Sequence, residues 1–148
     1  MMPHGRNFVV DTSVAMKWIV AEEGSDKADL LQGSDIVAPA LLRIEAGNVL
    51  RTLAAKGELS LERAIDLFLF LQTAPVTIID ADELLEQRAL ELALALQHPI
   101  YDCIYLALAE RTDRTLITAD RRFIKALSTT EHADRALALE ALGSEQST

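Results

Sequence analysis

The spacing of apolar and polar residues predicts alternating strands and helices. Short apolar, β-branched runs bounded by polar or turn residues are typical of buried strands. Longer segments with apolar residues every three or four positions are typical of helices packed on one side. The predicted strands are residues 7–11, 35–38, 76–79, 115–118 and, on weaker alternation, 136–139. The predicted helices are 14–20, 25–33, 39–56, 60–74, 82–97, 99–110 and 120–127.

This alternation predicts an α/β domain with a central, mostly parallel sheet of four to five strands between helical layers. The 148 residues suit one compact domain, with about 1–6 and 144–148 as flexible ends. In open parallel sheets, ligands bind beyond the carboxyl ends of the strands. Asp11 ends one predicted strand and Asp120 follows another. Both aspartates therefore lie where such a ligand would bind.

Two further acids occupy positions where an apolar residue is expected. Glu45 falls on a helical stripe with Leu41, Leu42, Ala46, Val49 and Leu53. Asp102 falls on another, with Tyr105, Leu106 and Ala109. A carboxylate on a buried face must be paired, protonated or bound to a metal, because burying an isolated charge is very costly.

Each acid also has a purely structural interpretation. Asp11 and Asp120 fit helix caps, and Asp102 fits a first helical turn, where it complements the helix dipole. Glu45 fits an ion pair with a core arginine. Four carboxylates converging on one crevice would repel one another unless cations lay between them. Oxygen donors without cysteine or histidine at ligand spacing favour Mg²⁺ or Mn²⁺ over zinc.

Composition narrows the function classes. The chain has 14 Lys and Arg against 23 Asp and Glu, a net charge of −9, which disfavours broad electrostatic binding to nucleic acid. One cysteine, Cys103, excludes an internal disulfide. No apolar run approaches the roughly 20 residues of a membrane span, and the N-terminus lacks the apolar run of a signal peptide. We therefore expect a cytoplasmic protein without a membrane partner.

Four ordered segments resemble the motif blocks of PIN-domain toxins of the VapC type. The segments are Val9–Trp18, Ala38–Leu50 around Glu45, Tyr101–Ala109 and Leu116–Phe123. The resemblance extends from about residue 8 to residue 123. Cys103 is less typical, since alanine is common after this aspartate in the family, and we interpret it as a small buried residue.

The resemblance implies a PIN-like three-layer α/β/α sandwich with an acidic pocket that binds Mg²⁺, with Mn²⁺ also supporting activity. By position, Asp11, Glu45, Asp102 and Asp120 are its acidic residues, both metal-binding and catalytic. Thr12, Ser13, Asn48 and Thr118 match polar positions beside the metals. The implied activity is cleavage of single-stranded or loop RNA. The implied partners are a second copy of the chain and a VapB-type antitoxin.

The resulting hypothesis is a metal-dependent endoribonuclease whose cations activate water for in-line attack on an RNA phosphodiester. Two alternatives stay open. One is a non-catalytic PIN-like module that binds RNA or protein. The other is a Mg²⁺-dependent phosphatase, which is disfavoured because Ser13 stands where phosphatases with an Asp-x-Asp motif have their second aspartate.

A last expectation concerns residues 61–71, which begin as an amphipathic helix and become apolar on all sides. Phe68 and Phe70 are two residues apart and so point about 200° apart on a helix. Neighbouring helices could cover both faces. We expect instead that one face binds a second subunit or an antitoxin segment, with Phe68 or Phe70 at or beside a protein interface.

Overall fold

The computed structural model describes residues 6–143 and contains five parallel strands in the order β3-β2-β1-β4-β5. The strands are β1 (Asn7–Val10), β2 (Asp35–Pro39), β3 (Thr77–Ile79), β4 (Thr115–Thr118) and β5 (Ala136–Ala138). β1 pairs with β2 on one side and with β4 on the other. Their apolar runs are buried, as expected for parallel strands covered on both faces.

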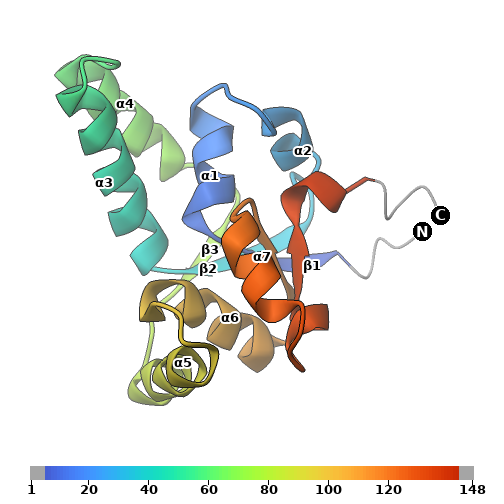
Figure 1. The fold of residues 1–148 in the computed structure, drawn as a ribbon. Coiled ribbons are helices and arrows are strands. Elements are labelled where there is room, and N and C mark those ends of the chain that lie inside the picture. Colours follow the sequence, from blue (N-terminus) through green and yellow to red (C-terminus); the bar gives the residue numbers. More distant parts are fainter. Residues whose placement is uncertain (1–5, 144–148) are drawn as a thin grey trace.

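Seven α-helices flank the sheet in the described part of the chain (Figure 1). They are α1 (Thr12–Ile19), α2 (Ser25–Asp29), α3 (Leu41–Ala55), α4 (Leu61–Leu71), α5 (Glu83–Leu96), α6 (Ile100–Thr112) and α7 (Arg121–Leu127). α1 and α6 lie on opposite faces of the sheet, and α3 and α4 form a hairpin to one side (Figure 1). The predicted three-layer α/β/α sandwich is confirmed.

The strand order places a topological switch point at β1. Consecutive strands run outward from β1 through β2 to β3, whereas β4 and β5 lie on the other side of β1. Loops at the carboxyl ends of β1 and β4 therefore diverge and leave a crevice between them, the usual ligand site of such sheets. Asp11 directly follows β1, and Asp120 follows β4 after one intervening residue.

Several helix starts agree with the predicted capping chemistry. The Asp11 side chain accepts a hydrogen bond from the Val14 amide, and Ser60 accepts one from the Arg63 amide. Asp120 accepts from the Arg122 and Phe123 amides. The structural interpretation of Asp11 and Asp120 as helix caps is therefore confirmed. It does not exclude a second role, since each carboxylate has two oxygens.

The predicted start of the helix after β2 was wrong. Pro39 does not begin a helix; it ends β2, paired in register with Ile79, and α3 begins at Leu41. Proline is tolerated at a strand end because its missing N–H costs no ladder hydrogen bond there. Arg6 is held by a 2.9 Å hydrogen bond from its guanidinium to the Leu30 carbonyl. The other residues of the predicted flexible ends lie outside the described range.

Within residues 6–143, no single helix is long and apolar enough to cross a membrane. α5 and α6 reach that length and apolarity only as a pair, and the pair is bent by 118° at its junction.

Candidate active site

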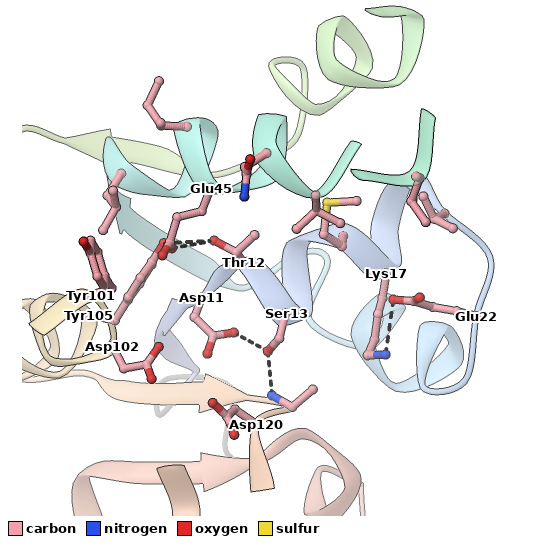
Figure 2. Close-up of a pocket in the computed structure, with 18 residues that line it drawn as sticks. Asp11, Thr12, Ser13, Lys17, Glu22, Glu45, Tyr101, Asp102, Tyr105 and Asp120 are labelled. Carbon is pink, nitrogen blue, oxygen red and sulfur yellow. Dashed lines mark hydrogen bonds and ion pairs between the residues drawn. The ribbon is translucent and has the colours of Figure 1, made fainter. Parts of the chain in front are cut away.

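A cavity of about 810 Å³ lies at the carboxyl edge of the sheet and brings the four predicted acids together (Figure 2). Asp11, Glu45, Asp102 and Asp120 all line it. Asp11, Asp102 and Asp120 surround one space, and Glu45 enters from α3 on the opposite side (Figure 2). The four carboxylates therefore converge on one cavity, as their places on strand ends and helix faces predict.

Asp11 is the most deeply buried of the four, with 7 % of its surface exposed. The Ser13 hydroxyl donates to Oδ1 at 2.5 Å, and the buried Thr118 hydroxyl donates to Oδ2. Burial raises the pKa of Asp11 to about 6, with a further contribution from the negative charge of Asp102. The two hydroxyl groups lower the pKa in part. The folded chain therefore holds Asp11 in an environment that disfavours its charge.

Glu45 is held by hydroxyl groups. The Tyr105 hydroxyl donates to Oε1 at 2.6 Å, and the Thr12 hydroxyl donates to the same oxygen at 2.9 Å. Tyr105 is 1 % exposed, and its burial, together with Glu45, raises the pKa of its phenol well above the usual range. Tyr105 is thus a fixed neutral donor to Glu45. Its role beside Glu45 was missed from the sequence, where it reads as an apolar-face residue.

Asp102 and Asp120 have different partners. The ring of His98 lies with Nε2 2.6 Å from Oδ2 of Asp102. Oδ1 of Asp120 accepts from the Arg122 amide at 3.0 Å. His98 was not among the residues predicted for the site, and its spacing of four from Asp102 was the signal that could have identified it.

None of these four carboxylates has a lysine or arginine within salt-bridge distance in residues 6–143. The alternative interpretation of Glu45 as the partner of a core arginine is therefore wrong for that range. Five carboxylates line the cavity, the fifth being Glu22, and Lys17 is the one lysine or arginine among the lining residues. Lys17 binds Glu22 at 3.3 Å and the Glu23 carbonyl at 2.6 Å. The cavity is therefore strongly acidic.

The residues of the predicted apolar stripe of α3 lie on two different faces of the helix. Leu42, Ala46 and Leu50 are buried in the core. Glu45 instead lies along the open cavity, together with the other lining residues of α3, which are Leu41, Ile44, Asn48, Val49 and Leu53. Glu45 is therefore half-buried in an acidic, partly apolar cavity, not enclosed in the core.

The predicted polar positions divide into two groups. Thr12, Ser13 and Asn48 line the cavity. Thr118 does not line it, but lies behind Asp11 and donates to that carboxylate. Cys103 is buried beside Asp102, and burial raises the pKa of its thiol to about 11. Such a thiol is protonated at neutral pH, which agrees with its interpretation as a small core residue.

The cavity offers carboxylate oxygens and no cysteine sulfur as ligands. Such a set of ligands suits a hard divalent cation. No three His, Cys, Asp or Glu side chains in residues 6–143 are already grouped closely enough to enclose an ion. Mg²⁺ is commonly held by one or two carboxylates and several waters, so a preassembled cage is not required. The residues therefore fit such an ion.

The fold and this cavity define an α/β domain with an acidic ligand site at a topological switch point. The sequence matches the PIN domain family over residues 8–127. This chain belongs to the PIN domain family. Among curated protein sequences, none matches the chain.

Solved structures with the same fold cover 80 to 95 % of the chain. PAE2754 from Pyrobaculum aerophilum has a TM-score of 0.70 and 22 % identity, covering 95 % of this chain and 96 % of that one. A toxin–antitoxin complex from Klebsiella pneumoniae has a TM-score of 0.64 and 14 % identity, with 88 % and 96 % covered. VapC20 from Mycobacterium tuberculosis, a Sarcin-Ricin loop cleaving toxin, has a TM-score of 0.61 and 16 % identity, with 80 % and 94 % covered.

Proposed function

We propose that this protein is a metal-dependent endoribonuclease and the toxin of a toxin–antitoxin pair. The observation that carries the proposal is the convergence of Asp11, Glu45, Asp102 and Asp120 on one cavity without a lysine or arginine partner in the described residues. Membership of the PIN domain family and the toxins among the similar structures support it. Together they favour a nuclease that acts on RNA.

Asp11, Glu45, Asp102 and Asp120 would hold the divalent cation, Mg²⁺ or Mn²⁺. The pKa of Asp11 is raised chiefly by burial and, in smaller part, by the negative charge of Asp102, and a bound cation would offset both costs. PIN nucleases in general depend on divalent metals. When bound, such an ion activates water for in-line attack and offsets charge developing on the phosphate oxygens.

The surrounding residues keep the carboxylates in place for that chemistry. Ser13 and Thr118 orient the two oxygens of Asp11, and Thr12 and Tyr105 orient Glu45. Asn48 is exposed on the cavity wall one turn after Glu45, where its amide is available to a bound substrate. Contacts of this second layer fix ligand orientation in metal sites generally.

Single-stranded or loop RNA is the substrate class we propose. A net charge of −9 gives little electrostatic attraction for a long phosphate backbone, so extended duplex binding is disfavoured. The cavity adds an apolar wall from α3, including Ile44 and Val49, against which an unstacked base can lie. Sequence-specific RNA recognition commonly uses such splayed bases.

The same features suit an antitoxin. Five carboxylates and one lysine line the cavity, beside the exposed apolar stripe of α3. A protein segment that combines a basic side chain with apolar residues would match both. Neutralisation by a VapB-type antitoxin would therefore consist of filling the cavity that RNA otherwise enters.

A homodimer through α4 is the proposed assembly. Phe68 is half-buried and approaches Gly47 of α3, whereas Phe70 is 58 % exposed on the other side of α4. Leu69, next to Phe70, is also exposed, and the exposed Ile65 lies on the Phe68 side, where both residues line a cavity between α3 and α4. We expect wild type to sediment as a dimer and Phe70→Asp as a monomer. A folded Phe70→Asp variant that remains dimeric, or a monomeric wild type, would contradict this assembly.

Cleavage of defined RNA tests the activity. Purified protein is incubated with single-stranded and stem-loop RNA oligonucleotides in Mn²⁺, Mg²⁺ or EDTA, beside the Asp102→Asn variant. We expect discrete products with metal, none in EDTA, and a loss of about 100-fold or more in the variant. Uncut RNA under every metal condition would overturn the proposed activity, and cutting that survives in Asp102→Asn would overturn the proposed site.

A further inference from the structure

His98 occupies the bend between α5 and α6, beside the acidic cavity. Gln97 adopts a left-handed conformation (φ 53°) at the end of α5, and the His98 amide donates to the Ala93 carbonyl at 3.1 Å. Pro99 then precedes the first turn of α6. This anchored backbone places the imidazole one helical turn before Asp102.

The imidazole contacts two elements that carry candidate metal ligands. Its Nε2 lies 2.6 Å from Oδ2 of Asp102 on α6. Its ring packs against the ring of Phe123 on α7, with centroids 4.7 Å apart and planes inclined by 40°. Phe123 is 1 % exposed, and the amide of that residue donates to Asp120. His98 therefore connects the helices that present Asp102 and Asp120.

We propose that His98 is a positioning residue for the metal site, whose Nε2–H fixes the Asp102 carboxylate. An ionised carboxylate only accepts hydrogen bonds, so Nε2 is the donor in this contact. Oδ2 is thereby engaged, and Oδ1 remains for a cation in the cavity. Packing against Phe123 and a side-chain exposure of 15 % restrict the ring to this orientation. This inference rests on the proposed function, since it assumes that the cavity binds a cation.

His132 provides a matched contrast. It is similarly buried, with 13 % of its side chain exposed, and its Nδ1 lies 3.6 Å from Oε2 of Glu110. Glu110 is held by the guanidinium of Arg88 at 2.8 Å and does not line the acidic cavity. Removing the His132 imidazole therefore removes a histidine–carboxylate contact without touching a candidate metal ligand.

Calorimetric titration with Mn²⁺ tests the role of His98 without relying on catalysis. The variants are His98→Leu and His98→Asn, which lack a donor that reaches Asp102, and His98→Gln, whose longer amide retains one. His132→Leu is the control. We expect the Mn²⁺ dissociation constant to rise about 10- to 100-fold in His98→Leu and His98→Asn. We expect His98→Gln to recover most of the affinity and His132→Leu to match wild type.

RNA cleavage gives a second readout. A positioning role predicts a higher Mn²⁺ concentration for half-maximal activity in His98→Leu, with kcat at saturating Mn²⁺ close to wild type. Folding is checked by circular dichroism in EDTA, and His98→Asn carries the test if His98→Leu does not fold. Wild-type Mn²⁺ affinity in a folded His98→Leu or His98→Asn variant would overturn this inference alone. No Mn²⁺ binding by wild type would instead overturn the proposed function.

Discussion

Two aspartates have the same local role in opposite environments. Asp11 caps α1 after β1, and Asp82 caps α5 after β3, each accepting from the amide three residues ahead. Asp82 is exposed and accepts two hydrogen bonds from Arg111, at 2.8 and 2.9 Å. These bonds hold the pKa of Asp82 below its ordinary value. Asp11 is buried beside Asp102, and its pKa is raised to about 6.

The contrast shows that capping alone does not explain the surroundings of Asp11. Asp82 caps its helix while its carboxylate is exposed to solvent and paired with an arginine. Asp11 is instead buried among further acids, an arrangement that disfavours the folded protein at neutral pH. A cation entering the cavity would remove that cost, which is why we interpret the cavity as a metal site. Active sites commonly contain such perturbed groups.

The largest expected difference between the two aspartates is in catalysis. Asp11→Asn removes a proposed metal ligand, so we expect kcat/KM for RNA cleavage to fall by about 100-fold or more. Asp82→Asn removes only a surface ion pair and should retain activity close to wild type. Initial rates on one RNA substrate in Mn²⁺ measure both. Similar losses in the two variants would mean that Asp11 has no catalytic role beyond that of a helix cap.

The second largest expected effect is the pH dependence of the free energy of unfolding without metal. The folded-state pKa of Asp11 is raised from 3.8 to about 6, which corresponds to about 3 kcal/mol. Asp11 adds this amount to the free energy of unfolding below pH 4. The added stability is lost as the pH rises through 6, because the ionised carboxylate is then buried. Urea unfolding in EDTA between pH 4 and 7.5 should show a decline in wild type that is reduced in Asp11→Asn.

Asp82→Asn should change the same profile in the opposite direction. Because the folded-state pKa of Asp82 is lowered, its contribution is present above the ordinary pKa and is lost as the pH falls. The variant should therefore be less stable than wild type at pH 7 and approach it in acid. Parallel profiles for the two aspartate variants would contradict the assigned environments.

A smaller effect is expected at Glu45. Tyr105→Phe removes the hydroxyl that donates to Glu45 at 2.6 Å while keeping the buried ring. We expect Mn²⁺ affinity to fall about 10-fold and the free energy of unfolding by about 1 kcal/mol. Tyr101→Phe is the control, because Tyr101 also lines the cavity but is 60 % exposed. Unchanged Mn²⁺ affinity in Tyr105→Phe would mean that Glu45 is not a ligand or needs no orientation.

Much of the fold follows from local patterns in the sequence. The apolar run of residues 115–118 coincides with β4, and alternation of strands and helices predicts the parallel sheet. The places of Asp11 and Asp120 follow from it, because carboxyl ends of parallel strands share one edge. Pro39 was misplaced because proline suits both a helix start and a strand end. Its pairing with β3 decides between them, and that contact is long-range.

The surroundings of the site residues were harder to predict from the sequence. Helical spacing placed Glu45 among apolar residues, but it does not show whether that stripe faces the core or an open cavity. The hydroxyl of Tyr105 reaches Glu45 across 60 positions, and no local pattern encodes such a contact. His98 was recoverable, since residues four apart on a turn can meet. The raised pKa of Asp11 depends on tertiary burial and could not be predicted.

Thermal unfolding over a Mn²⁺ titration shows whether these carboxylates hold a divalent cation. Wild type, Asp11→Asn and Asp82→Asn are compared with EDTA as the reference. A site that binds only the folded protein stabilises it by about 2.7 kcal/mol at 100 times the dissociation constant. We predict that Tm rises with Mn²⁺ equally in wild type and Asp82→Asn, and far less in Asp11→Asn. Equal rises in wild type and Asp11→Asn, or no rise in wild type, would mean that Asp11 is not a ligand of a cation in this cavity.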